Sequence, residues 1–305
     1  VIGRVFRQRG DIDTTDLANS GDMGHIVRRL LQKGVSGARI TVSIGDSTAD
    51  TVSVRGGYFR VNCCLSSPVS GTGAFLPAYV TSVYDDDTTS THAEVYIPPE
   101  PSSMVVISDI DDTIVHTGVA NKLRMLWRLF MQPAESRTVF SGVAAFYRAL
   151  HDGVSGDEYN PMLYVSRSPW TLYDVLDRFF NMHWIPVGPI LFLRDWGLSR
   201  THPFPRRSRD HKLKIIREML EIYNTKPFIL IGDSGQKDPE IYMRKLEMFP
   251  SRIKALYIRY TGRKKRNKRL DRLTEESAKL GAEMVFVHST KEAFEHAVKN
   301  GFIDK

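Results

Sequence analysis

From residue 104 onward, short apolar segments alternate with segments of helical periodicity, and this alternation constrains the fold more than any other feature of the sequence. The apolar segments, all of strand length, are Val105–Ser108, Met162–Val165, Ile190–Leu193, Phe228–Ile231, Ala255–Ile258 and Met284–Val287. The helix-period segments between them are Val143–Leu150, Trp170–Phe180, Leu213–Tyr223, Glu240–Met248 and Leu270–Leu280. Wholly apolar strands alternating with helices are typical of a parallel sheet covered on both faces. We therefore predict a doubly wound, Rossmann-like α/β domain at residues 104–305.

The residues before this domain have a different pattern, with apolar and polar side chains alternating every second position. The alternating segments, which we predict to be strands, are Ala38–Ile44, Asp50–Val54, Tyr58–Asn62 and Ala93–Ile97, with turns at Gly45–Asp46 and Gly56–Gly57. An amphipathic helix is predicted at His25–Leu31. We expect an all-β, sandwich-like module at residues 1–98, which the proline-rich linker 99–103 joins to the α/β domain.

Composition limits the partners and the location of the chain without fixing either. A length of 305 residues suits two domains, and a net charge of +7 suits acidic partners such as phosphate esters, anionic lipid or nucleic acid. The sequence has no run of about 18 apolar residues, and its opening residues do not resemble a signal peptide. We expect a cytoplasmic protein, with peripheral membrane contact as an open alternative.

Polar and charged residues follow three of the predicted strands. The first strand leads into Asp109-Ile110-Asp111-Asp112-Thr113, the second into Ser166-Arg167, and the fourth into Gly232-Asp233 with Asp238 five residues later. Lys212 opens the helix before that fourth strand. Each feature alone is commonly a helix cap or a tight turn. Because parallel strands end at one edge of their sheet, we expect these side chains to gather there as a ligand site.

The grouping suits phosphoryl transfer. One carboxylate can attack phosphorus to form an aspartyl phosphate, while a second carboxylate handles the proton. Carboxylates gathered around a phosphate need a cation, and their hard oxygen atoms indicate Mg²⁺. Zinc would favour histidine or cysteine, and the nine histidines form no such cluster in the sequence. Lysine and serine side chains can hold the phosphoryl oxygens.

The same motifs resemble a known family. Asp109-Ile110-Asp111-Asp112-Thr113, a serine after the second strand, a lysine, and Gly232-Asp233 with Asp238 resemble the four motifs of haloacid dehalogenase superfamily phosphatases. Tyr164-Val165-Ser166-Arg167-Ser168-Pro169-Trp170 and Ile229-Leu230-Ile231-Gly232-Asp233-Ser234-Gly235 are similar to the catalytic domain of the actin-patch-type phosphatidate phosphatase family. The resemblance implies a haloacid dehalogenase-type fold, with a small helical cap around residues 114–160.

The resemblance also implies a role for each residue of the first motif. Asp109 would be the nucleophile and a Mg²⁺ ligand. Asp111 would protonate the leaving alkoxide and then activate water, with its main-chain carbonyl on the metal. Thr113 would support the loop and so complete the catalytic set, whereas Asp112 is interpreted as structural.

The later motifs would bind substrate and metal. Ser166 and Lys212 would be both catalytic and substrate-binding, since they hold the transferring phosphoryl group. Asp233 would complete the metal site, with Asp238 assisting. Arg167 stands where a small polar residue is common in the family, so we assign it to substrate binding and leave the identity of the substrate open.

Two kinds of segment bear on that identity. Leu123–Met131 is apolar with interleaved arginines and could contact acyl chains or pack on the domain core. The basic runs Arg206–Arg209 and Arg263–Arg269 could dock anionic lipid, follow a nucleic-acid backbone, or be solvated loops.

Three functions therefore stay open, in order of preference. The first is a magnesium-dependent phosphatase that acts on phosphatidate at an anionic membrane surface. The second is a phosphatase of soluble or polynucleotide phosphate esters, with nucleic acid the less favoured partner. The third is a phospholipid-binding module without catalysis.

Overall fold

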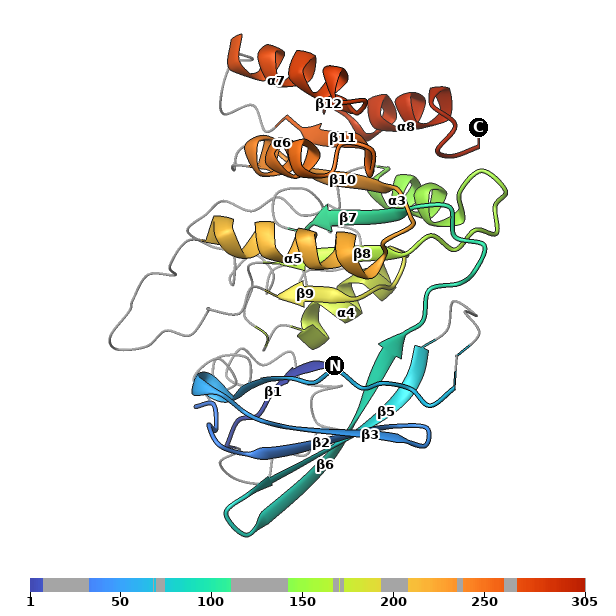
Figure 1. The fold of residues 1–305 in the computed structure, drawn as a ribbon. Coiled ribbons are helices and arrows are strands. Elements are labelled where there is room, and N and C mark those ends of the chain that lie inside the picture. The colour runs from blue at the N-terminus through green and yellow to red at the C-terminus, as the bar shows by residue number, and fades with distance from the viewer. Residues whose placement is uncertain are drawn as a thin grey trace. The chain divides into compact units, whose positions relative to one another are not determined.

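The structure, a computed structural model, describes residues 1–7, 33–67, 69, 75–110, 142–166, 170, 173–192, 208–234, 238–260 and 268–304. They fall into two compact units, one built on Val1–Glu100 and the other on Pro101–Ser168 and Tyr173–Lys305 (Figure 1). The predicted helix at His25–Leu31, the apolar segment Leu123–Met131 and the residues 114–141 of the predicted cap lie outside the described residues.

The first unit consists of two antiparallel sheets. One has the order β3-β2-β5-β6, formed by β2 (Arg39–Ile44), β3 (Ser47–Val52), β5 (Phe75–Tyr84) and β6 (Asp87–Tyr96). The other pairs β1 (Ile2–Arg4) with β4 (Tyr58–Arg60), which follows the short 3-10 turn η2 (Arg55–Gly57). Alternate side chains of β2 enter a hydrophobic core that also contains Phe59 of β4, so the two sheets share one core. The sandwich class of this unit stays a prediction.

Two strands of this unit begin earlier than the sequence predicts. β6 begins at Asp87 rather than Ala93, because Asp87–Tyr96 pairs residue by residue with β5, a strand missing from the predicted set. The polar residues that open β6 are exposed, and backbone pairing with β5 does not require apolar side chains there. β3 begins at Ser47 rather than Asp50, because Gly45–Asp46 closes a two-residue hairpin and pairs Ile44 with Ser47.

The second unit is built on a parallel sheet of six strands. These are β7 (Val105–Asp109), β8 (Met162–Ser166), β9 (Ile190–Phe192), β10 (Phe228–Asp233), β11 (Ile253–Arg259) and β12 (Glu283–Val287). Their order is β12-β11-β10-β7-β8-β9, and every pairing is parallel. β7 is buried along its whole length, which explains its continuous apolar sequence. All six strands of the predicted parallel sheet are therefore confirmed.

Helices pack on both faces of this sheet. They are α3 (Val143–Asp152), α4 (Tyr173–Met182), α5 (Ser208–Ile222), α6 (Asp238–Met248), α7 (Lys268–Lys279) and α8 (Thr290–Lys299). Neighbouring residues of a strand point to opposite faces. Ile107 of β7 packs in a core with residues of α5 and α6, whereas Ser108 is hydrogen-bonded to Tyr147 of α3. The α5–α6 group and α3 therefore cover opposite faces, as Figure 1 also shows.

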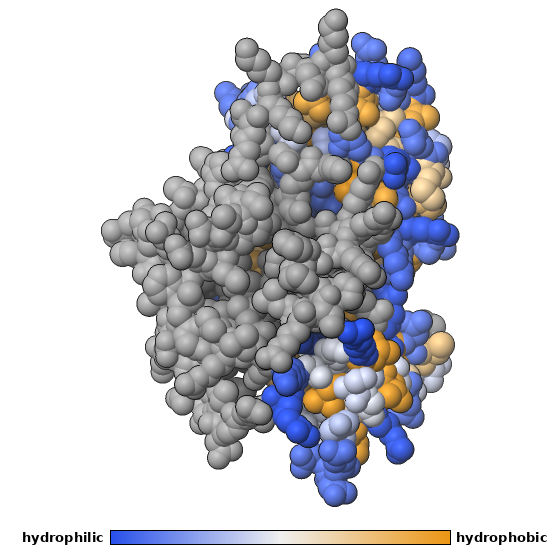
Figure 2. Space-filling view, turned by 90° about the vertical axis from the view of Figure 1, so that its left-hand side faces the viewer, coloured by the Kyte–Doolittle hydropathy of each residue, from blue (hydrophilic) through white to orange (hydrophobic). Residues whose placement is uncertain are grey.

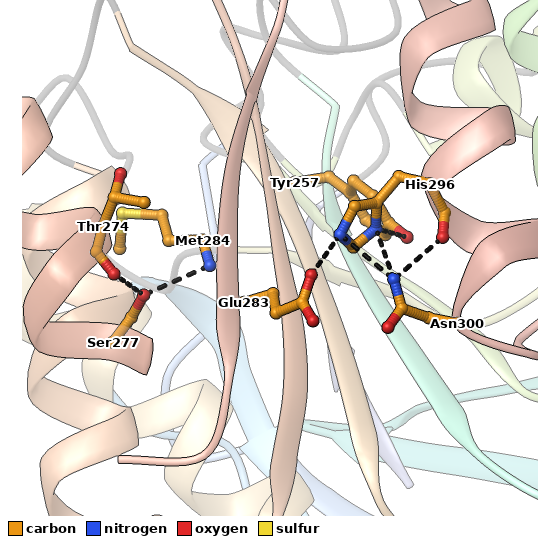
Figure 3. A network of polar contacts seen from close by, with 7 residues as sticks. All are labelled: Tyr257, Thr274, Ser277, Glu283, Met284, His296 and Asn300. Carbon is orange, nitrogen blue, oxygen red and sulfur yellow. Dashed lines mark hydrogen bonds and ion pairs between the residues drawn. The ribbon is translucent and has the colours of Figure 1, made fainter. Parts of the chain in front are cut away.

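Helix α8, which the sequence analysis does not predict, is fixed to the sheet by a polar network (Figure 3). His296 of α8 lies 3.0 Å from the hydroxyl of Tyr257 through Nδ1 and 2.5 Å from the carboxylate of Glu283 through Nε2. These partners lie on β11 and β12, so the network connects α8 to both strands. The N-cap residue of α8, Ser289, accepts a hydrogen bond from the backbone N–H of Glu292.

Among the described residues, none of the helices combines the length and the apolar character that a bilayer span needs.

Candidate active site

The order of the parallel strands places the candidate site. The chain runs from β7 outward through β8 to β9, and then returns to the other side of β7 with β10, β11 and β12. In open α/β sheets ligands bind at such a reversal, beyond the carboxyl ends of the strands. Asp109 is the last residue of β7 and Asp233 is the last residue of β10, and these strands are neighbours. Both side chains are buried.

Asp238 joins these two carboxylates from the first turn of α6. Its Oδ2 accepts a hydrogen bond of 3.2 Å from the backbone N–H of Asp233, which ties the start of α6 to the end of β10. The close approach depends on Gly232, because a Cβ atom at that position would lie 2.5 Å from Oδ2 of Asp238. A glycine before Asp233 is therefore required by the packing of the site.

Lys212 brings a positive charge to the carboxylates from α5. Its Nζ lies 2.6 Å from Oδ1 of Asp238 and 3.1 Å from Oδ1 of Asp109. Burial by itself lowers the pKa of Lys212, but the two carboxylates more than offset that effect, so the pKa is raised above its ordinary value. Lys212 is therefore protonated at neutral pH and offsets one of the negative charges of the site.

Tyr242 supports this arrangement by contacts with β10 and Lys212. Its hydroxyl donates a hydrogen bond of 2.8 Å to the carbonyl of Ile231, and its ring centroid lies 5.2 Å from Nζ of Lys212. Burial, reinforced by the Asp238 carboxylate, raises its pKa well above the ordinary value, so the hydroxyl stays protonated. Tyr242 is not among the residues predicted from the sequence, although its position four residues after Asp238 on a helix places both on one face.

A second support acts from the opposite face of the sheet. Ser108 donates a hydrogen bond of 3.0 Å to the carbonyl of Asp109, and its hydroxyl lies 2.6 Å from that of Tyr147 on α3. Tyr147 in turn stacks on Tyr164 of β8. These contacts restrain the end of β7, and no local sequence signal identifies them, because they join residues far apart in the chain.

Ser166 lies beside this group, and the other predicted residues are not described. Ser166 is buried at the end of β8, one residue beyond Val165, which pairs with Asp109 across the sheet. Asp111, Thr113 and Arg167 lie outside the described residues. The structure thus brings together Asp109, Lys212, Asp233 and Asp238, with Ser166 on the neighbouring strand.

The three carboxylates fit a metal ion. Asp109, Asp233 and Asp238 each offer an oxygen atom, and these atoms lie within 4.8 Å of one another. All three residues are buried, where uncompensated negative charge is costly. A set made only of carboxylate oxygens suits a hard divalent cation better than zinc. The geometry supports a metal site without identifying the ion.

Similarity to known proteins agrees with this site. Residues 104–260 match the family described as "Phosphatidate phosphatase APP1, catalytic domain". This range contains β7, β8, α5, β10 and α6, and therefore Asp109, Ser166, Lys212, Asp233 and Asp238.

Two yeast proteins are similar to this chain over part of their length. Phosphatidate phosphatase APP1 of Saccharomyces cerevisiae is 33% identical over 201 residues, which cover 66% of this chain and 31% of that protein. The uncharacterized protein C29B5.04c of Schizosaccharomyces pombe is 31% identical over 159 residues, which cover 50% of this chain and 24% of that protein. The chain thus spans about a third or less of the length of these relatives.

Among solved structures, XAC1771, a carbohydrate acetylesterase from Xanthomonas citri, is similar with a TM-score of 0.32 and 11% sequence identity, over 89% of this chain and 70% of that one. A likeness at this level carries no argument about fold or function. The family match does, because it covers residues 104–260, just over half of the chain, with the buried carboxylates inside it. The chain belongs to the family of the phosphatidate phosphatase APP1 catalytic domain.

Proposed function

We propose that the chain is a Mg²⁺-dependent phosphatase that hydrolyses phosphatidate through an aspartyl phosphate on Asp109. The observation that carries the proposal is the buried group of Asp109, Asp233, Asp238 and Lys212 at the reversal of the strand order. Phosphoryl transfer depends on positioning and on charge stabilisation, and this group supplies both. A doubly wound fold of the haloacid dehalogenase type belongs to the same proposal, which the strand order supports.

The reaction divides into two displacements at phosphorus. A carboxylate oxygen of Asp109 attacks phosphorus, the bond to the ester oxygen breaks, and the leaving alkoxide takes a proton from Asp111. A water molecule then gives a proton to Asp111 and attacks the same phosphorus, which releases inorganic phosphate and restores Asp109. Thr113 supports the loop that carries Asp111. Atoms and charge balance over the two steps without an additional reactant.

The remaining residues hold the phosphoryl group. Lys212 already contacts Asp109 at 3.1 Å, so its ammonium group lies beside the attacking carboxylate and can bind a phosphoryl oxygen there. Ser166 follows the residue that pairs with Asp109, and its hydroxyl can donate to a second oxygen. Arg167 is the next residue in the chain and is proposed to contact the substrate.

Mg²⁺ would be held by Asp109, Asp233 and Asp238, with the main-chain carbonyl of Asp111 as a further ligand. When bound, the ion offsets the negative charge of the carboxylates and of the phosphate. Lys212 contacts both Asp109 and Asp238 and so orients these two carboxylates.

The domain organisation of the chain belongs to the same proposal. We propose a β-rich module at residues 1–98, a linker at 99–103 and a phosphatase domain at 104–305 with a cap around 114–160. Contact with an anionic membrane surface, in an otherwise cytoplasmic protein, would bring the domain to its lipid substrate. The basic runs Arg206–Arg209 and Arg263–Arg269 support that contact by their charge alone.

The test is phosphate release from two substrates, diacyl phosphatidate in mixed micelles and a soluble aryl phosphate, each with Mg²⁺ or with EDTA. Release from phosphatidate that requires Mg²⁺ is the expected result. Release from the aryl phosphate alone would retain the phosphatase and reject the lipid. Binding of phosphatidate vesicles without release of phosphate would instead favour the non-catalytic module.

A further inference from the structure

A pocket opens at the carboxyl edge of the parallel sheet, on the face that α3 and α8 cover. Its walls are mainly apolar and include Val143, Phe146, Ile231, Tyr257, Val287 and Ala293. The space between them is about 390 Å³ when the part open to solvent is counted. We call it the α3–α8 pocket.

This pocket adjoins the proposed reaction site through two strands. Ile231 in its wall precedes Asp233 by two residues on β10, a separation of about 7 Å along an extended strand. Arg259, also in the wall, is the register partner of Asp233 on β11. A phosphate held at the carboxylates therefore leaves the rest of its molecule within reach of this pocket.

A second connection runs through β7. Tyr147 lines the pocket, and its hydroxyl lies 2.6 Å from that of Ser108, the residue before Asp109. One hydrogen-bonded pair of side chains thus joins the pocket wall to the residue that precedes the proposed nucleophile.

The chemistry of the walls selects a hydrocarbon ligand. Phe146 and Ala293 are buried, and the hydroxyl of Tyr257 is already hydrogen-bonded to His296 (Figure 3). The lining also includes His288, Ser289 and Thr290, of which Ser289 is engaged in capping α8. A ligand rich in hydroxyl groups would place them against hydrocarbon at a cost, whereas a methylene chain would not.

Arg259 adds a polar contact to this apolar space. Burial lowers its pKa to about 10, which still leaves it charged at neutral pH. A guanidinium group donates only, so it suits ester carbonyl or phosphate oxygens at the polar end of a lipid.

We propose that the α3–α8 pocket receives an acyl chain of the substrate, beside the carboxylates that process its phosphate. This assignment rests on the proposed function, because it takes the substrate to be a diacyl phosphate monoester. Each methylene group buried from water strengthens binding about fourfold, so the pocket would make turnover depend on chain length.

The first test compares two variants on α8. Ala293→Leu adds volume inside the pocket, and Ala297→Leu adds the same volume one turn later, at a buried position outside the pocket lining. We expect Ala293→Leu to lower kcat/KM for long-chain phosphatidate about tenfold relative to a soluble aryl phosphate. Filling a site that holds ligand methylenes removes their burial. Ala297→Leu should leave that ratio within about twofold of the wild type.

The second test needs no variant and therefore does not depend on folding of a substituted chain. Phosphatidate carrying a photoreactive diazirine in one acyl chain is irradiated with the wild-type protein, and the labelled peptides are identified by mass spectrometry. Labels on the peptides that contain Phe146 and Ala293 are expected.

The outcomes separate the two proposals. If the wild type hydrolyses phosphatidate but Ala293→Leu leaves the substrate ratio unchanged and the labels fall elsewhere, the pocket assignment alone is wrong. If the wild type hydrolyses the aryl phosphate and no phosphatidate, the lipid substrate is wrong and the pocket assignment fails with it.

Discussion

At the scale of single residues, Lys212 brings a positive charge to two buried carboxylates, Asp109 and Asp238. Replacing it by Met would leave both carboxylates buried without that ammonium group. Breaking a buried ion pair by removing one partner costs about 3–5 kcal/mol. We expect the free energy of unfolding of Lys212→Met, measured in urea without Mg²⁺ at neutral pH, to fall by that amount.

Lys214 gives the matched control, because it lies two residues away on α5 and its exposed side chain is 3.9 Å from Glu218. Lys214→Met should change the free energy of unfolding by less than about 0.5 kcal/mol. Equal, small losses in both variants would contradict the buried position of the Lys212 ion pairs.

Gly232 is the other residue with a specific expected effect. An added Cβ would lie 2.5 Å from Oδ2 of Asp238 and 2.9 Å from the hydroxyl of Tyr242, so Gly232→Ala must displace one of them. Displacing groups that orient metal ligands typically weakens metal binding about 10–100-fold. Calorimetric titration with Mg²⁺ should show at least a tenfold loss in Gly232→Ala. Wild-type Mg²⁺ affinity in this variant would contradict the claim that the close packing at position 232 orients the metal ligands.

At the scale of elements, the segment between α3 and β8 is organised around one carboxylate. Glu158 accepts hydrogen bonds from the backbone N–H of Val154, at 3.0 Å, from Nδ2 of Asn160, at 2.9 Å, and from the hydroxyl of Ser103. Gly153 makes room for it, since a Cβ there would lie 2.1 Å from the carboxylate. Burial alone raises the pKa of Glu158, but these hydrogen bonds outweigh burial and lower it below 4.5.

This pKa fixes the pH dependence of Glu158→Gln. A carboxyl group whose pKa is lower in the folded than in the unfolded protein stabilises the fold above its unfolded pKa, and that contribution is lost as the pH falls through the folded pKa. Glu158→Gln should therefore lower the free energy of unfolding by about 1–2 kcal/mol at pH 7. The difference from the wild type should shrink below pH 4.5, the ordinary value for this group.

Glu295 provides the control for that measurement, because it is an exposed carboxylate on the surface of α8 that pairs with Lys291 at 3.7 Å. Glu295→Gln should leave stability nearly unchanged across the same pH range. A loss in Glu158→Gln that stays constant down to acid pH would mean that the charge of Glu158 does not contribute.

At the scale of the whole molecule, the sequence predicts the parallel sheet well, because β7, β8 and β10 are buried along their length and are apolar up to the polar residues near their carboxyl ends. It also predicts that Asp109, Asp233 and Asp238 meet, since parallel strands end at one edge. Figure 2 shows the face of the molecule toward which the arrows of β7 and β9 point in Figure 1. Among the described residues on this face, hydrophobic and hydrophilic ones are interspersed.

What the sequence does not predict depends on contacts between distant residues. Tyr147 and the early start of β6 are determined by partners elsewhere in the chain, so no local pattern indicates them. Tyr242 also bonds to a distant residue, and only its spacing from Asp238 on α6 gives a local indication. Helix α8 does have a local signal, because Ser289 followed three residues later by Glu292 is a capping-box pattern that indicates a helix start. That helix could have been predicted from the sequence.

The most direct test of the central claim is Mg²⁺-dependent phosphate release from phosphatidate by the wild type, Asp109→Asn and Glu221→Gln. Glu221 is an exposed carboxylate on α5 that pairs with Arg217, so its amide variant makes the same chemical change away from the site. The account predicts turnover in the wild type and in Glu221→Gln, and loss of about a thousandfold or more in Asp109→Asn, as expected when the nucleophile of a covalent mechanism is removed. Phosphate release by Asp109→Asn at the wild-type rate would contradict it.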